Sequence, residues 1–204
     1  NSYTPPKKIL ERYANVLVNF ALGGGKGIKK GETVLVWGKE CTKPLFIEVC
    51  KAVWRAGGHA IIQYTLDNSE RRGTVADFYK IATPEQLNFF PEKYYRGLIE
   101  QIDHHAAILG EADPHFLKGI DPKKIMQYGK ALKPYLEWRR EKENKGKFTW
   151  ALVLYGTSAV AKEARMTERE YWQQIIKACF LDKANPVREW KKVLAEKYPD
   201  VVND

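Results

Sequence analysis

Long hydrophobic runs are missing from this sequence. No stretch of the 204-residue chain approaches the roughly 20 apolar residues that a membrane-spanning helix requires. The chain opens with NSYTPPKK, which has neither the charged-then-apolar layout of a secretory signal nor an initiator methionine. We therefore expect no membrane segment, and we interpret the absent methionine as the sign of a fragment or a cleaved chain.

Cysteine is also scarce. The three cysteines, Cys41, Cys50 and Cys179, are odd in number and form no CxxC pair. This pattern favours reduced thiols in a cytoplasmic protein over a disulfide framework. Cys41 lies between two lysines just before a predicted helix, a setting that can lower a thiol pKa and create a nucleophile. No histidine is placed by the sequence to assist it, so an ordinary loop cysteine is the favoured interpretation.

Two familiar chemical motifs are absent as well. The sequence contains no HExxH pairing of histidines on a helix and no GxGxxG fingerprint. A glycine-rich stretch does occur at residues 23–31, GGGKGIKKG. A phosphate-binding loop follows a strand and opens a helix, whereas this stretch follows a predicted helix and precedes a strand. We interpret it as a flexible basic joint.

Negative charge is in deficit, with 34 Lys and Arg against 25 Asp and Glu, which gives a net charge of +9. Such an excess is compatible with a nucleic-acid partner or with a small anionic ligand. The basic residues cluster at 123–147, but Glu137, Glu141 and Glu143 interleave with them, as on a solvated helix. No nucleic-acid-binding motif is visible. Two alternatives stay open: a small-anion or nucleotide-binding module and a basic nucleic-acid-binding domain.

Short apolar runs separated by helical patterns are what the sequence does contain. A nearly continuous apolar run such as TVLVW is typical of a strand that is buried on both faces. Strand, helix, strand with short joints predicts right-handed βαβ units. We predict a single α/β domain with a mainly parallel sheet of about four or more strands, flanked by helices in a three-layer, Rossmann-like arrangement. The predicted strands are Thr33–Trp37, His59–Leu66, a run from His104 to Gly110, and Phe148–Thr157.

Helix start signals divide the rest of the chain. Capping boxes are predicted at TPEQ (83–86) and TERE (167–170), where a threonine caps the helix and a later Gln or Glu reaches back. A polar helical region is expected from Asn68 to Ile102. Asp121 and Pro122 open a long helix that Pro134 should kink. Its buried side is expected to carry Ile125, Leu132 and Leu136.

The stretch DHHAAILGEADPH (103–115) holds three of the four histidines and looks like a metal site. On a strand, however, His104 and His105 point to opposite faces. A strand from His104 to Gly110 rises roughly 20 Å, which carries His115 towards the opposite edge of the sheet. Since zinc needs ligands within roughly 2.1 Å, these histidines cannot share one ion. His59 also begins a predicted strand and could lie near His104. We assign no metal ligand.

Ligands of parallel α/β sheets usually bind outside the carboxyl ends of the strands. In this sequence those ends are WGKE and YGTS. Position alone therefore makes five residues candidates for lining a pocket, without any specific chemistry attached. They are Trp37, Gly38, Tyr155, Gly156 and Thr157.

Several segments together resemble one protein family. They are ILERYANVLVNFAL with IKKGETVLVWG, then LKGIDPKKI (117–125), and YGTSAVAKEARMTEREYWQQIIKACFLDKANPVREWKKV (155–193). In this order they resemble the amino-terminal half of the thermophilic-type metallo-aminopeptidases, the aminopeptidase T and aminopeptidase S group. The resemblance extends from about Ile9 to Val193, nearly the whole chain.

This resemblance implies a two-domain cytoplasmic exopeptidase that removes N-terminal residues from peptides. In that family two divalent metals, zinc or cobalt among them, activate a water, and the subunits form dimers that enclose a chamber. The family's metal ligands lie in its second half, so no catalytic residue carries over to this chain. We therefore expect residues 1–204 to be the amino-terminal half, inactive by itself. It would shape the chamber and the dimer, with its own catalytic C-terminal domain, peptides and a second subunit as partners.

Overall fold

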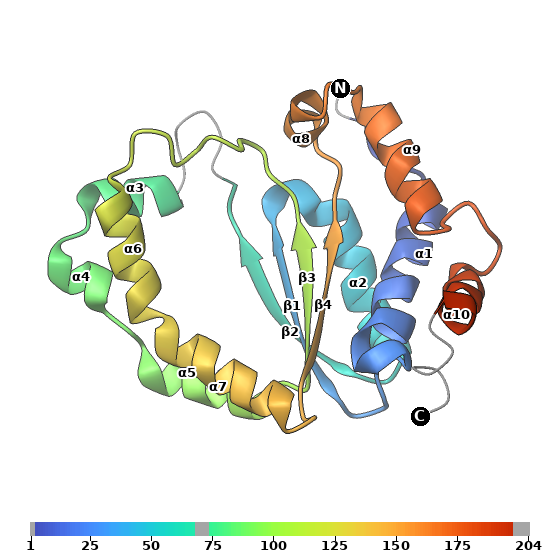
Figure 1. The fold of residues 1–204 in the computed structure, drawn as a ribbon, viewed down its shortest axis with the longest axis horizontal. Helices are drawn as coiled ribbons and strands as arrows, with labels where there is room; N and C mark the ends of the chain where they lie inside the picture. Colours follow the sequence, from blue (N-terminus) through green and yellow to red (C-terminus); the bar gives the residue numbers. More distant parts are fainter. Residues whose placement is uncertain (1–2, 68–73, 198–204) are drawn as a thin grey trace.

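A four-stranded sheet in which every strand is parallel to its neighbours forms the centre of the molecule (Figure 1). The computed structural model describes residues 3–67 and 74–197. The strand order is β2-β1-β3-β4. β2 therefore lies on one side of β1, and β3 and β4 lie on the other side. The predicted α/β class is confirmed. The strands are β1 (Thr33–Lys39), β2 (His59–Thr65), β3 (His104–Leu109) and β4 (Thr149–Leu154).

Strand register assigns each side chain to one of two faces. Val34 pairs with His104, and the next residue, Leu35, pairs with His105. Because side chains alternate along a strand, the first pair lies on one face and the second pair on the other. We call the face of Val34 the first face and the face of Leu35 the second face.

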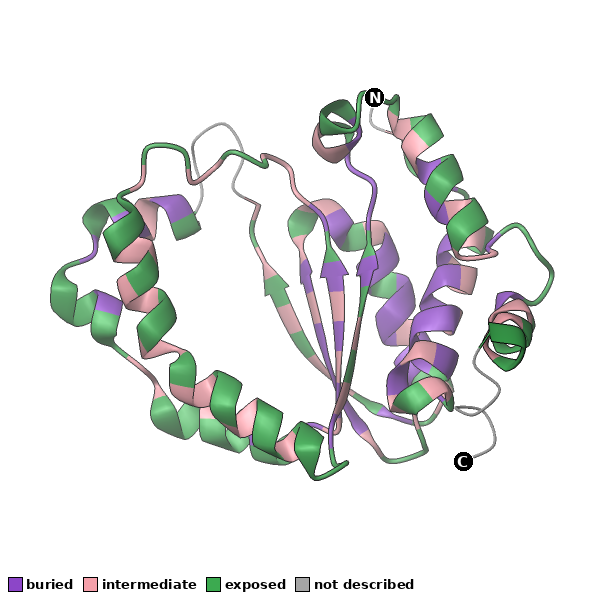
Figure 2. Ribbon diagram, in the orientation of Figure 1, coloured by how far each residue is buried: buried purple, intermediate pink, exposed green. Residues whose placement is uncertain are grey.

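The first face carries the main core of the protein. Helices α1 (Lys7–Val16) and α2 (Lys43–Arg55) cover it, with α9 (Glu168–Ala178) and α10 (Pro186–Lys197) packed outside α1 (Figures 1 and 2). Trp172 of α9 is fully buried and makes edge-on ring contacts with Tyr13 of α1 and Tyr155 after β4. Aliphatic side chains from both helices and the sheet fill the space between, as the apolar spacing of the sequence predicts.

The first helix ends in the glycine-rich joint, as expected. After α1 the chain continues as a wider π turn, η1 (Leu17–Ala21), and then a short turn, η2 (Leu22–Gly25). Gly27 has a positive φ of 77°, and a Cβ there would lie 2.7 Å from the backbone of Asn19. Only glycine fits so close to another main chain in this conformation. The joint therefore turns tightly from helix into β1.

The second face is covered only in part. Helices from the middle of the chain form an arm that bows away from the sheet and meets it near the strand starts (Figure 1). There Leu98, Ile99 and Ile102 pack with Leu35 and Phe148 in a second, smaller core. A third cluster lies wholly within the arm. The arm consists of α3 (Thr74–Ile81), α4 (Pro84–Asn88), α5 (Glu92–Gln101), α6 (Pro122–Ala131) and α7 (Lys133–Asn144).

The long helix predicted from Asp121 differs from expectation. Asp121 caps it as predicted, but the helix divides at Leu132, and Pro134 lies in the first turn of α7. No residue of α6 or α7 is fully buried, and Leu136 is 49% exposed. Tyr135 and Trp138 pack on the second core instead. The expectation for Leu136 is wrong because α7 touches the sheet through its aromatic side chains.

Both predicted capping boxes are present. Thr83 accepts a hydrogen bond from the Gln86 amide, and Thr167 accepts one from the Glu170 amide. The expected helical region that starts at Asn68 is observed from Thr74, and residues 68–73 lie outside the described chain. In the described part, no helix has the length and apolar character needed to cross a bilayer. The remaining helices are α8 (Ser158–Glu163), α9 (Glu168–Ala178), α10 (Pro186–Lys197) and the short turn η3 (Glu40–Thr42).

Candidate functional site

His104 is a buried, hydrogen-bonded polar side chain at the start of the sheet. It is 5% exposed, and its ring lies between Thr149 of β4 and Glu32 just before β1. The Nδ1–Oγ1 distance to Thr149 is 2.7 Å, and the Nε2–Oε2 distance to Glu32 is 2.8 Å. Both ring nitrogens are therefore occupied by hydrogen bonds within the protein.

The four histidines do not converge. His105 faces the second face, and its Nε2 is buried without a hydrogen-bond partner among the described residues. His115 is exposed and contacts Glu163 at 3.2 Å. His59 starts β2, so β1 separates it from His104. The predicted separation of His104 from His105 by strand alternation is confirmed.

These residues do not fit a dinuclear metal centre. Burial, together with repulsion from Arg139, lowers the pKa of His105 to about 4, and its buried Nε2 has no hydrogen-bond partner among the described residues. Within residues 3–67 and 74–197, no group of three or more His, Cys, Asp or Glu side chains is placed to hold a metal ion. We therefore derive no metal-dependent step from this chain.

Cys41 lies at the carboxyl edge of the sheet, in the turn after β1. Burial, reinforced by a hydrogen bond to Asp67, raises its thiol pKa to about 12. The thiolate is the nucleophilic form of cysteine, so a raised pKa suppresses its reactivity near neutral pH. The interpretation of Cys41 as an ordinary loop cysteine agrees with this environment.

The five positional candidates lie at the carboxyl edge, but on different faces. Trp37 is half-buried on the second face, whereas Gly38 is buried on the first. A Cβ on Gly38 would lie 2.7 Å from the Phe46 ring, so α2 packs directly on this backbone. Burial raises the pKa of Tyr155 to about 12, although a hydrogen bond to Thr4 opposes the shift.

The last two candidates form a closely packed turn after β4. Gly156 accepts a hydrogen bond from the indole Nε1 of Trp172 at 2.9 Å. Thr157 caps α8, and its hydroxyl donates to the Glu111 carbonyl at 2.6 Å. Glu111 in turn forms an ion pair with Lys39 at the end of β1. These contacts tie the ends of three strands together.

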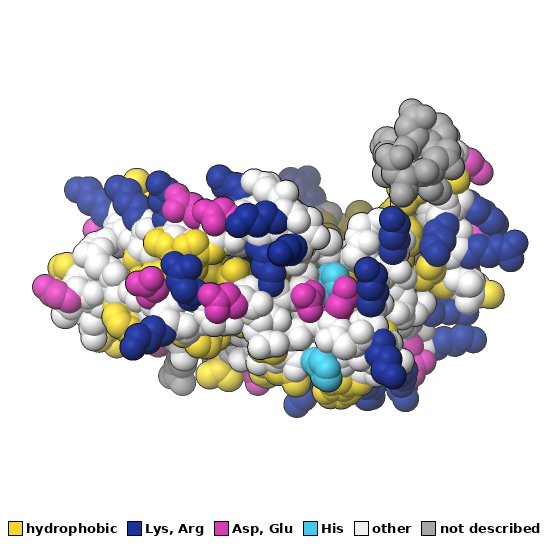
Figure 3. All heavy atoms as spheres, turned by 90° about the horizontal axis from the view of Figure 1, so that it is seen from below, with side chains coloured by type: hydrophobic (Ala, Val, Ile, Leu, Met, Phe, Trp, Pro, Cys, Tyr) yellow, Lys and Arg dark blue, Asp and Glu magenta, His cyan; other side chains and the backbone are white. Residues whose placement is uncertain are grey.

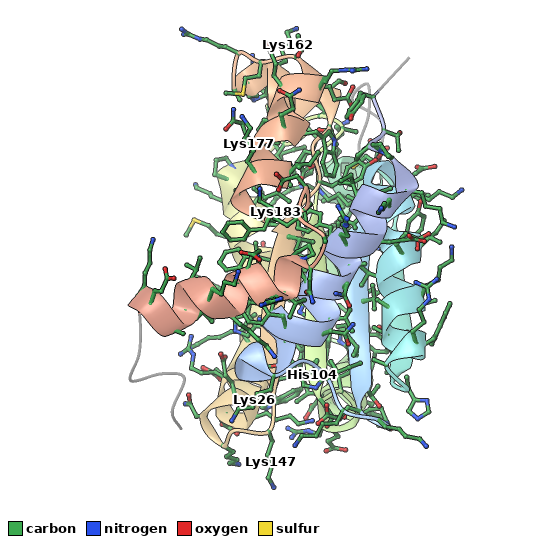
Figure 4. All side chains as sticks on the ribbon, turned by 90° about the vertical axis from the view of Figure 1, so that its right-hand side faces the viewer. Lys26, His104, Lys147, Lys162, Lys177 and Lys183 are labelled. Atoms are coloured by element: carbon green, nitrogen blue, oxygen red, sulfur yellow. The ribbon has the colours of Figure 1, made fainter. Side chains whose placement is uncertain are left out.

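A pocket of about 510 Å³ lies at the opposite, amino-terminal edge of the sheet. The glycine-rich joint, the starts of the strands and the end of α7 surround it, and Figure 4 shows Lys26, His104 and Lys147 at this end of the molecule. Figure 3, seen from the side where the strands begin, shows acidic and basic side chains interspersed. The residues that line the pocket are Gly23, Lys26, Gly27, Lys29, Glu32, Glu100, Asp103, His104, Lys142, Gly146, Lys147, Phe148 and Thr149.

The charges of this pocket are mixed, with four lysines and the carboxylates of Glu32, Glu100 and Asp103 in its lining. Lys26, Lys29 and Lys147 have no ion-pair partner among the described residues. Glu32 is held by His104: burial acts to raise its pKa, but hydrogen bonds from His104 and from the Lys29 amide outweigh burial and lower it. The lysines outnumber the carboxylates by one, so the lining has a small positive excess.

Sequence reasoning missed this pocket because it placed ligands at the carboxyl edge. Lys142 helps to build its wall, since its ammonium donates to the carbonyls of Ile99 at 2.8 Å and Ile102 at 2.6 Å. These residues lie about forty positions apart in sequence. The lysines on either side of the strand starts, Lys29 and Lys147, were the only local signal.

Comparison with known proteins gives consistent matches. Aminopeptidase AmpS of Bacillus subtilis (strain 168) is 24% identical over 184 residues, which cover 86% of this chain and 44% of that protein. Aminopeptidase 2 of Geobacillus stearothermophilus is 24% identical over 195 residues, covering 91% of this chain and 45% of that protein. The chain spans less than half the length of these relatives and aligns to their amino-terminal half.

A solved structure shares the fold. Wild-type AmpT from Thermus thermophilus superposes with a TM-score of 0.69 at 20% identity, over 91% of this chain and 45% of that one. The family described as thermophilic metalloprotease (M29) matches residues 6–199. The resemblance seen in the sequence is thereby confirmed, and this chain belongs to the thermophilic metalloprotease (M29) family.

Proposed function

We propose that this chain forms the amino-terminal, non-catalytic α/β domain of a cytoplasmic aminopeptidase that hydrolyses N-terminal residues from peptides. The observation that carries the proposal is the family match along residues 6–199, aligned to the amino-terminal half of relatives named as aminopeptidases. The two divalent metals implied by the family, zinc or cobalt, would be held by the companion half. When bound, they would supply an activated water.

The role proposed for this domain is architectural. With its own catalytic C-terminal domain and a second subunit, it would form the wall of a chamber for peptides and part of a homodimer. The carboxyl-edge residues Trp37, Gly38, Tyr155, Gly156 and Thr157 are the proposed pocket-lining positions. Packing of Gly38 against Phe46, and the hydrogen bond of Trp172 to Gly156, support a rigid edge.

An activity assay tests this proposal. The 204-residue chain is incubated with aminoacyl-p-nitroanilides in the presence of zinc, cobalt or manganese, with aminopeptidase 2 of Geobacillus stearothermophilus as the active control. We expect no metal-dependent turnover above that of buffer, because no group of three or more His, Cys, Asp or Glu side chains in the described residues is placed to hold a metal ion. Robust turnover that requires metal would overturn the assignment of a non-catalytic domain.

A second candidate is a small-anion-binding module, favoured by the pocket at the amino-terminal edge. Three of its lysines lack an ion-pair partner in the described part of the chain. A thermal-shift series with phosphate and nucleotides at low ionic strength tests it. The Lys26→Gln, Lys147→Gln double variant should lose any stabilisation, and Lys183→Gln, remote from the pocket in Figure 4, serves as control. Absence of stabilisation in the unmodified chain would reject this function.

A further inference from the structure

Strand β4 forms one edge of the sheet. Within the described chain it pairs with β3 alone. The amides of Thr149 and Tyr155 donate to carbonyls on the β3 side, at Asp103 and Leu109. Backbone groups alternate in direction along a strand, so those of Trp150 and Leu152 point outward, away from β3. The outward amide of the next such residue, Leu154, donates to the Tyr13 hydroxyl at 3.2 Å.

The residues whose backbone groups point outward also expose apolar side chains on the second face. Trp150 is 45% exposed, Leu152 47% and Leu154 46%, and Leu109 beside them on β3 is 37% exposed. Parallel sheets are ordinarily buried on both faces. Exposed apolar side chains that are contiguous mark an interaction surface. We call these four residues, with the outer backbone of β4, the β4 edge surface.

The arm leaves this surface open. Its helices reach the second face near the strand starts, at Phe148 and Leu35, and α7 also contacts Trp150 through Arg139 and Glu143. Leu152, Leu154 and Leu109 lie beyond these contacts. In Figure 1 the arm then curves away from the carboxyl-terminal half of the sheet, and Figure 2 shows exposed positions along β4. Trp150 and Leu152 therefore offer both an unpaired backbone edge and apolar side chains, and Leu154 adds a third apolar side chain.

One end of the β4 edge surface is positively charged. A hollow of about 220 Å³ beside Trp150 is lined by Arg139 and Arg140 of α7. The Arg139 guanidinium lies 5.3 Å from the centre of the Trp150 ring. Neither arginine has an ion-pair partner in residues 3–67 and 74–197. The one carboxylate of the hollow, Glu143, accepts a hydrogen bond from the Trp150 indole at 2.9 Å. A carboxylate ligand would complement this end.

We propose that the β4 edge surface binds an extended, apolar peptide as an additional strand, antiparallel to β4, with its free carboxylate at Arg139 and Arg140. The inference rests on the proposed function, because it names where a peptide would lie along the wall of the chamber. A peptide offers backbone groups to an open edge and alternate side chains to the apolar face. The antiparallel direction brings the peptide's carboxylate to the amino-terminal end of β4, and its amino terminus to the turn at Tyr155.

Calorimetric titration of the metal-free 204-residue chain with the peptide Ala-Leu-Val-Leu-Ala tests the proposal. Three forms of the peptide are compared: the free acid, the C-terminal amide, and a free acid with N-methyl groups on the residues facing β4. We expect the free acid to bind and the N-methylated form to bind about tenfold more weakly, since it loses hydrogen bonds worth about 1 kcal/mol each. The amide should bind about threefold to tenfold more weakly than the acid.

Protein variants locate the binding surface. Leu152→Glu should abolish binding, while Ile62→Glu, at a site 54% exposed on the other edge strand, should leave it unchanged. Arg140→Gln should make acid and amide bind alike. Circular dichroism confirms that each variant folds, and the N-methylation comparison needs no variant at all.

Three results would overturn the proposal: no binding at millimolar peptide, equal binding of the N-methylated peptide, or full binding by Leu152→Glu. A fourth result that would overturn the proposal comes from sedimentation equilibrium. A dimer that Leu152→Glu dissociates and that excludes peptide would show that a second copy of this chain covers the surface. Failure here is distinguishable from failure of the proposed function, which is judged by metal-dependent turnover, whereas this titration measures binding without catalysis.

Discussion

At the scale of the residue, His105 shows what the sheet imposes on a polar side chain. Strand alternation directs it to the second face, away from the bonded His104. Its Nε2 is buried without a hydrogen-bond partner among the described residues. An unsatisfied buried polar group reduces the stability of a fold. The alternation was predictable from sequence, whereas the missing partner depends on what packs over the strand.

This environment predicts a pH dependence of stability. The pKa of His105 falls from 6.5 to about 4 because of burial and, secondarily, Arg139. Between these values the unfolded chain binds the proton and the folded chain does not, so stability is full above pH 6.5 and falls as the pH drops towards 4. In the unmodified protein this titration should lower the free energy of unfolding by about 2 to 3 kcal/mol between pH 7 and pH 4.5, and His105→Leu should abolish that part of the decrease. Urea unfolding at pH 7 and pH 4.5 measures it.

The matched control for this prediction is His115→Leu. His115 is exposed and its contact with Glu163 is a surface ion pair of small energy, so its replacement should leave the pH dependence nearly as in the unmodified protein. An unchanged pH dependence in His105→Leu would contradict the assignment.

At the scale of the element, the helix boundaries follow local chemistry. The capping boxes at Thr83 and Thr167, and the cap at Asp121, form where the sequence predicts them, because every partner lies within three residues. The long helix from Asp121 was predicted less well. Its division at Leu132, and the exposure of Leu136, depend on how α7 meets the sheet.

A single substitution tests the capping box of α9. Thr167→Ala removes the acceptor of the Glu170 amide, and it should lower the free energy of unfolding by about 1 kcal/mol. Thr167→Ser keeps the hydroxyl and should cost less than half of that. Chemical denaturation of both variants measures the difference. Equal losses in the two variants would mean that the methyl group, and not the cap, stabilises this helix.

At the scale of the whole molecule, the protein has one large core and a lightly attached arm. The first face buries α1 and α2 against the sheet, whereas the arm contacts the second face through one small cluster and holds another within itself. No residue of α6 or α7 is fully buried. Elements with few buried apolar contacts open at lower free energy than the core does.

Native-state hydrogen exchange should therefore separate the two parts. We expect amides of α3, α4 and α6 to exchange through local opening, several kcal/mol below the free energy of global unfolding. Amides of β1, β3 and α2 should exchange only with global unfolding. Lys142→Met, which removes the hydrogen bonds from α7 to the end of α5, should speed exchange in the arm and leave that of β1 unchanged. A single opening energy for arm and core would refute this division.

The sequence by itself determined the α/β class, the helix caps and the separation of the histidines, because periodicity and capping act between near neighbours in the chain. The family followed from the resemblance of several of its segments to known aminopeptidases. Tertiary structure alone decided the strand order and the pocket at the amino-terminal edge. It also left β4 as an open edge beside exposed leucines. These features arise from contacts such as that of His104 with Glu32, 72 residues apart, and no local pattern specifies which distant residues meet.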